Sequence, residues 1–223
     1  MPVPLVPVKA LAEAKGRLAP TVGPLQRRLL AIAMFEDVIA ALQAVPGLDA
    51  PVVVSPDREV WRRADAMGCR VVEEPPGAGD LNRSLATAAA KAGNGSGLLV
   101  VAADLPLASA AGLERVLAAA EAPVAVVPSH DGGGTNVLAW RDPGSFAPSF
   151  GPDSAARHLA VPGAVRVDEP GLALDVDTAD DLRLVAGRLD PASVTARRLA
   201  DLGIPGLMQR SDSPGWNRDM LQP

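Results

Sequence analysis

An aspartate at the end of a buried strand is the first candidate for chemistry in this 223-residue chain. Asp104 directly follows the apolar run 98–103, which does not alternate with polar residues and so predicts a strand buried on both faces of a parallel sheet. Such sheets bind ligands beyond the carboxyl ends of their strands, where a carboxylate is a ligand for a hard cation such as Mg²⁺. Capping of the helix expected near Ser109, or closing of a turn, would also explain Asp104.

Three cations follow the first predicted strand, residues 3–8. Lys9, Lys15 and Arg17 lie where an α/β nucleotide-binding fold meets phosphates, and they could balance the charge of a transferring phosphoryl group. A solvated basic loop is the alternative. The chain has no Gly-x-x-x-x-Gly-Lys motif, which excludes a P-loop.

A second acidic cluster lies near the end of the chain. Asp175 and Asp177 share one side of the segment if it is extended, and Thr178 can cap the helix that follows. One of these aspartates is predicted to be the partner of Asp104, because two carboxylates with phosphate oxygens and water commonly hold Mg²⁺.

A glycine-rich loop follows the strand predicted at residues 123–127. Three glycines, 132–134, would let the backbone approach a ligand and point several N–H groups at one anion, and Thr135 and Asn136 add side-chain donors. An ordinary hairpin turn is the alternative.

Two further segments have weaker signals. Residues 150–158 read as a helix start where backbone amides, Ser154 and Arg157 suit a phosphate or carboxylate, and where His158 is a ligand contact or a structural residue. In the loop 73–82, Asn82 or backbone amides could read a nucleotide base, although helix capping by Asp80 or Asn82 explains the pattern equally well.

The elements that must position these groups alternate regularly between strand and helix. The alternation predicts an α/β fold with a mostly parallel sheet and helices on both faces. Prolines 2, 4 and 7 predict that the first strand is irregular or edge-like. We expect a single domain over residues 1–207 and a polar, flexible tail over residues 208–223. The predicted strands cover 3–8, 51–55, 69–72, 98–103, 123–127, 137–140 and 164–167, and the longer helices cover 24–45, 81–91, 109–121 and 191–202.

Composition excludes several function classes. No apolar run approaches the ~20 residues of a membrane span, and a net charge of −5 with no Tyr, three Phe and three Trp argues against nucleic-acid binding. The single cysteine, Cys69, excludes an internal disulfide, fits a cytoplasmic protein and is expected in the core. Without a serine elbow or a reactive cysteine, the residues suit a reaction with an anionic nucleophile, such as nucleotidyl transfer onto a phosphate.

Five short segments in this order resemble the CofC/FbiD family, guanylyltransferases of coenzyme F-420 biosynthesis, from Pro7 to about Leu189. The family's fold is similar to the Rossmann-like fold of nucleotide-diphospho-sugar transferases and related nucleotidyltransferases. The segments are Val-Lys-x5-Lys-x-Arg-Leu from Val8, Ala-Asp-Leu-Pro-Leu from Ala103, Asp-Gly-Gly-Gly-Thr-Asn from Asp131, Phe-Gly-Pro-Asp-Ser-x2-Arg-His from Phe150 and Asp-Val-Asp-Thr from Asp175.

The resemblance implies an enzyme that joins GTP to phosphoenolpyruvate, or to 2-phospho-L-lactate, and releases pyrophosphate. Asp104 and Asp177 would hold Mg²⁺, and Lys9, Lys15 and Arg17 would balance the charge of the triphosphate. The activated diester would pass to a separate downstream transferase, and the resemblance leaves a homodimer open.

The resemblance also assigns residues to the two substrates. Thr135, Gly151 and Ser154 match positions that bind the acceptor, with Asn136 and His158 beside them, and Gly79 and Asn82 fall in the segment expected to bind the nucleotide. The residues themselves leave two rivals open, namely another transferase of the same fold and a nucleotide-binding module without catalysis.

Overall fold

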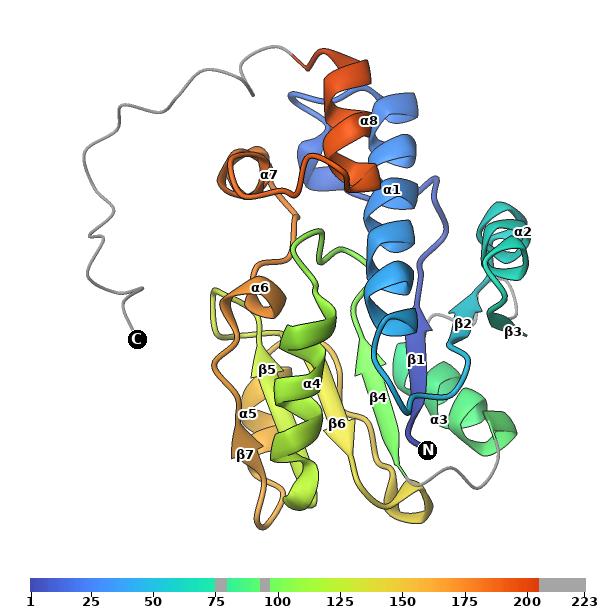
Figure 1. The fold of residues 1–223 in the computed structure, drawn as a ribbon, viewed down its shortest axis with the longest axis vertical. Helices are drawn as coiled ribbons and strands as arrows, with labels where there is room; N and C mark the ends of the chain where they lie inside the picture. The colour runs from blue at the N-terminus through green and yellow to red at the C-terminus, as the bar shows by residue number, and fades with distance from the viewer. Residues whose placement is uncertain (75–79, 93–96, 205–223) are drawn as a thin grey trace, which may run out of the picture.

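A central β-sheet organises the computed structural model, which describes residues 1–74, 80–92 and 97–204 (Figure 1). The strand order is β3-β2-β1-β4-β6-β5-β7. The pairs β1–β2, β1–β4, β2–β3 and β5–β7 are parallel, whereas β6 is antiparallel to both neighbours, so the predicted mostly parallel sheet is confirmed with one antiparallel strand. The strands are β1 (Val3–Pro7), β2 (Val52–Ser55), β3 (Arg70–Glu73), β4 (Leu98–Val101), β5 (Val124–Pro128), β6 (Thr135–Trp140) and β7 (Val165–Arg166).

The helices begin close to where the sequence predicts them. Side-chain oxygens of Asp57, Ser109, Thr178 and Ser193 accept backbone N–H groups at the starts of α2, α4, α7 and α8. The short helix α6 was not predicted. The α-helices are α1 (Pro24–Gln43), α2 (Arg58–Ala66), α3 (Leu81–Ala92), α4 (Ala110–Ala118), α5 (Ser154–Leu159), α6 (Pro170–Ala173), α7 (Ala179–Ala186) and α8 (Val194–Leu202), with 3-10 turns η1 (Gly16–Leu18), η2 (Ala119–Glu121) and η3 (Pro143–Ser145).

Helices cover both faces of the sheet, because alternate strand residues point to opposite sides. Leu99 and Val101 pack in one core cluster with residues of α1, α2 and α4, whereas Leu98 and Val100 pack in another with residues of α3. All four β4 residues are therefore buried, as the uninterrupted apolar run predicts.

The expectation that β1 is edge-like is wrong, because this strand is central and pairs with β2 and β4. The register explains how it tolerates prolines. Pairing with β4 covers Val3 to Leu5 and pairing with β2 covers Leu5 to Pro7. Because successive N–H groups point to opposite neighbours, Pro4 and Pro7 fall where the missing N–H faces an unpaired stretch.

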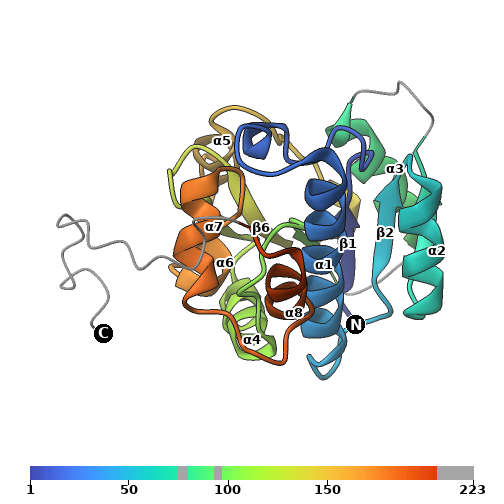
Figure 2. The same ribbon diagram turned by 90° about the horizontal axis from the view of Figure 1, so that it is seen from above.

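A third core cluster lies outside the sheet, where α8 packs beside α1 (Figure 2). Leu18 and Val176 both belong to it, which holds the segment after β1 near the segment before α7. Cys69 is buried, as predicted, and burial raises the pKa of its thiol to about 11. Among the described residues, no helix is both long and apolar enough to cross a membrane. Gly79 and the predicted tail 208–223 lie outside the described residues.

Candidate functional site

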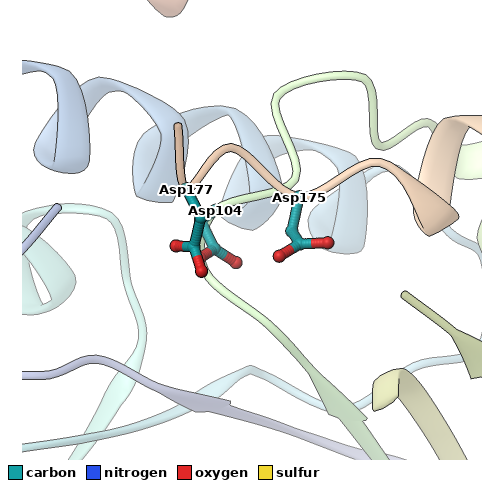
Figure 3. A group of neighbouring side chains, drawn as sticks. All are labelled: Asp104, Asp175 and Asp177. Atoms are coloured by element: carbon teal, nitrogen blue, oxygen red, sulfur yellow. The ribbon is translucent and has the colours of Figure 1, made fainter. Parts of the chain in front are cut away.

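Three aspartates gather at the carboxyl end of β4. One carboxylate oxygen from each of Asp104, Asp175 and Asp177 lies within 4.8 Å of the others (Figure 3). Asp104 comes from the exit of β4 and the other two from the segment between α6 and α7. The N–H of Val176 donates to the carbonyl of Asp104 at 3.1 Å, which fixes the two segments against each other. This all-oxygen donor set suits a hard divalent cation. Asp104 does not cap α4, since Ser109 fills that role.

Lys15 enters this cluster from the loop after β1. Its Nζ lies 2.5 Å from Oδ2 of Asp104 and 3.2 Å from Oδ1 of Asp177, and its side chain is 8% exposed. Burial by itself would lower the pKa of Lys15, but the two carboxylates outweigh burial and raise the pKa above its ordinary value. Lys15 is therefore a cation held among the aspartates.

The other two predicted cations lie farther out. Arg17 is exposed and its Nη1 lies 3.4 Å from Oδ2 of Asp177. Lys9 is exposed directly after β1, and among residues 1–74, 80–92 and 97–204 it has no ion-pair partner. The structure thus brings Lys15 and Arg17 to the aspartates, whereas Lys9 makes no ion pair with them.

Asn136 holds the acidic segment in place. It is buried, and its Nδ2 donates to the carbonyls of Leu172 at 3.1 Å and Ala173 at 2.8 Å and to Oδ1 of Asp175 at 3.2 Å. The sequence predicts that Asn136 contacts substrate, which stays a prediction; in the structure its amide donates to Asp175 and positions it. Burial and the nearby Asp104 raise the pKa of Asp175.

Asp181 is a positioning residue that sequence reasoning missed. Its Oδ2 accepts the N–H of Asp177 at 3.0 Å and of Thr178 at 2.7 Å, and Thr178 in turn caps α7 as predicted. His130 lies between Asp175 and Asp181, at 3.5 Å and 3.4 Å. The Thr-x-x-acid pattern of a capping box was the signal that could have identified Asp181.

The glycine loop does not form the anion cradle expected from its three glycines. The N–H groups of Gly132, Gly133 and Gly134 donate to the Ser129 carbonyl, to Oδ1 of Asp131 and to Oγ of Ser129. The loop connects the antiparallel strands β5 and β6, so the hairpin alternative is confirmed. Short polar side chains next to the glycines satisfy these amides inside the turn.

Thr135, Ser154 and His158 form a buried polar chain between β6 and α5. Oγ of Ser154 lies 3.1 Å from Oγ1 of Thr135, which lies 3.0 Å from Nδ1 of His158. The N–H of Ser149 donates to Nε2 of His158 at 3.0 Å. His158 is buried and both of its ring nitrogens have partners within the protein, so its ring supports the two hydroxyls instead of binding a ligand. Gly151, at φ +122°, lies in the loop before α5 and takes a backbone conformation that favours glycine.

The buried imidazole makes stability depend on pH. Burial, with the nearby Arg157, lowers the pKa of His158 from 6.5 to about 4. On acidification the unfolded chain takes up this proton near 6.5 and the folded chain only near 4, so the free energy of unfolding falls through this range, by up to about 3 kcal/mol. Urea titrations across these pH values should show a shallower decline for His158→Asn than for the wild type. Equal declines would contradict this assignment.

Asn82 connects α3 to the segment that carries Gly151. Its Oδ1 accepts the N–H of Phe150 at 2.7 Å, and its Nδ2 donates to the Phe150 carbonyl at 3.1 Å. The capping role belongs to Asp80, whose Oδ1 accepts the N–H groups of Asn82 and Arg83. Base recognition by Asn82 stays a prediction, now alongside a clear structural role.

Comparison with known proteins agrees with this geometry. A family profile described as "Guanylyl transferase CofC like" matches residues 3–187. The phosphoenolpyruvate guanylyltransferase of Nocardia farcinica is 44% identical over 207 residues, covering 89% of this chain and 91% of the relative. That of Streptomyces avermitilis is 43% identical over 209 residues, covering 91% and 95%.

The fold matches solved structures of the expected kind. A putative nucleotide-diphospho-sugar transferase from Desulfovibrio desulfuricans superposes with a TM-score of 0.71 at 17% identity, over 90% of this chain and 95% of that one. The predicted nucleotidyltransferase fold is therefore confirmed. With the family profile covering most of its length and relatives above 40% identity, the chain belongs to the CofC-like guanylyl transferase family.

Proposed function

We propose that this enzyme joins GTP to phosphoenolpyruvate and releases pyrophosphate. The observation that carries the proposal is the cluster of Asp104, Asp175 and Asp177, with Lys15 paired to the first and the last of them. The relatives of the chain that are named phosphoenolpyruvate guanylyltransferase support the same reaction. The resemblance to the family further implies that the activated diester would pass to a downstream transferase of coenzyme F-420 biosynthesis.

The aspartate cluster is the proposed metal site. Asp104 and Asp177 would hold Mg²⁺, and Asp175 lies close enough to join them. The residues fit, because a half-buried set of carboxylate oxygens suits this ion. When bound, the ion supplies positive charge that offsets the charge developing on the triphosphate.

The chemistry is an in-line displacement at phosphorus. A phosphate oxygen of phosphoenolpyruvate forms a bond to the α-phosphorus of GTP, and the bond from that phosphorus to the bridging oxygen breaks, so pyrophosphate leaves with the electron pair. The nucleophile is already anionic and needs no general base. Lys15, Arg17 and Lys9 are proposed to bring the two anionic substrates together and to stabilise the leaving group.

The acceptor is proposed to bind at Thr135, Gly151 and Ser154. Gly151 is exposed and its carbonyl accepts the N–H of Ser154, whose hydroxyl is bonded to that of Thr135. A glycine backbone and two hydroxyls therefore lie together there, which suits a small phosphate and carboxylate. The nucleotide is proposed to lie toward Asn82 and Gly79, so that the hydrogen bonds between Asn82 and Phe150 would connect the two substrate sites.

The test is pyrophosphate release from GTP and Mg²⁺ with phosphoenolpyruvate, with 2-phospho-L-lactate and without an acceptor. We expect release that requires phosphoenolpyruvate, with ATP and CTP as weaker donors. Release only with 2-phospho-L-lactate would change the acceptor and keep the reaction. GTP binding without release in any mixture would contradict the proposal.

A further inference from the structure

We propose that His158 is a positioning residue that makes the Thr135–Ser154 hydroxyl pair donate a hydrogen bond toward the acceptor's anionic group. This inference rests on the proposed function, because it assumes that the acceptor binds at these hydroxyls. His158 itself would not touch the acceptor, since both of its ring nitrogens already have partners, Thr135 and the N–H of Ser149.

The hydrogen-bond partners of the imidazole determine its tautomer. The backbone N–H of Ser149 can only donate, and it lies 3.0 Å from Nε2, so Nε2 is the acceptor nitrogen. A neutral ring then carries its proton on Nδ1. Burial keeps the ring neutral by lowering its pKa to about 4. Nδ1–H therefore donates to Oγ1 of Thr135 across 3.0 Å.

The number of hydroxyl protons decides what the pair can donate. Thr135 and Ser154 carry two, and one of them forms the 3.1 Å bond between the two oxygens. His158 supplies a proton to this pair and accepts none. The second hydroxyl proton is thus left for a partner outside the chain Ser154–Thr135–His158, and a phosphate or carboxylate oxygen is the partner that such a donor favours. If Nδ1 were the acceptor nitrogen, it would accept the hydrogen bond from this hydroxyl, and no hydroxyl proton would be left for a ligand.

The segment before α5 holds the imidazole ring in place. Phe150 packs edge-to-face against it with centroids 4.9 Å apart, and the Ser149 carbonyl accepts from the guanidinium of the neighbouring Arg157. The loop that carries Gly151 is therefore attached to the same imidazole whose other nitrogen orients Thr135. His158 therefore sets both the direction in which the hydroxyl pair donates its hydrogen bond and the position of the loop.

Two isosteric substitutions separate these functions. In His158→Gln the amide reaches the Nε2 position and can still accept from Ser149, but the donor to Thr135 is lost. In His158→Asn the amide nitrogen replaces Nδ1 and can donate to Thr135, but the acceptor for Ser149 is lost. We expect His158→Gln to raise the KM for phosphoenolpyruvate by about tenfold or more, with the KM for GTP unchanged. His158→Asn should keep the KM for phosphoenolpyruvate near that of the wild type and should lower the Tm.

A double substitution and an NMR measurement complete the test. In a Thr135→Val background, His158→Gln should cause no further rise in acceptor KM. ¹⁵N NMR of the wild-type protein should show the Nδ1–H tautomer for His158, and it remains decisive if a variant does not fold. Equal kinetic losses in both His158 variants, an unchanged KM in His158→Gln, or the Nε2–H tautomer would overturn the role of His158. Wild-type protein that releases no pyrophosphate with either acceptor would instead overturn the proposed function, and the acceptor role with it.

Discussion

Asp104→Asn is expected to reduce pyrophosphate release by at least about 100-fold while the protein stays folded. Replacing groups that only support metal ligands costs about 10- to 100-fold, so removing the charge of a direct ligand should cost at least that much. The shape of the side chain is kept, and the Asp104 carbonyl still accepts from Val176, because that bond does not involve the side chain.

Two readouts separate metal binding from folding in this variant. Calorimetric titration with Mn²⁺ or Mg²⁺ should show weaker binding, and the far-UV spectrum should match the wild type. Asp168→Asn is the matched control, since Asp168 is 80% exposed and its one ion pair within the described part of the chain is with Arg166 at the surface. A fully active Asp104→Asn enzyme would show that this carboxylate holds no metal during turnover.

Lys15→Met is expected to remove most of the activity and to destabilise the protein in the absence of divalent cations. Lys15 is the buried cation between Asp104 and Asp177. Without it, the aspartates repel one another in a partly desolvated site. Because both carboxylates remain partly exposed, at 28% and 43%, we expect a loss of about 1–3 kcal/mol in the free energy of unfolding.

Metal should reverse much of this loss of stability. Thermal melts in EDTA and in Mg²⁺ should show a larger metal-induced rise in Tm for Lys15→Met than for the wild type, because a divalent cation replaces the missing charge. Lys91→Met serves as the control, since Lys91 is exposed in the last turn of α3. An equal rise in Tm with Mg²⁺ in Lys15→Met and in the wild type would contradict the idea that the ammonium group and the metal neutralise the same carboxylates.

Most strands and helices could be predicted from local sequence patterns. Strand and helix alternation, the apolar run before Asp104 and the capping residue Thr178 depend on near neighbours in the chain, and each is confirmed. The antiparallel β6 was expected only as the hairpin alternative, because whether a glycine-rich loop reverses the chain or binds an anion depends on which groups its amides meet. In this protein Ser129 and Asp131 accept from them.

The contacts within the site required the tertiary structure. Lys15 is 89 residues from Asp104 and 162 from Asp177, so no local pattern could show that it lies buried between them. Asn136 and His158 have residue types that suit ligand binding, and only packing showed that one holds the acidic segment and the other supports two hydroxyls. Local periodicity and residue type were enough to predict most strands and helices, the order of the motifs and the polar groups at the strand exits. Which of these groups pair and which stay available depends on burial and long-range packing, and only the folded structure shows those partners.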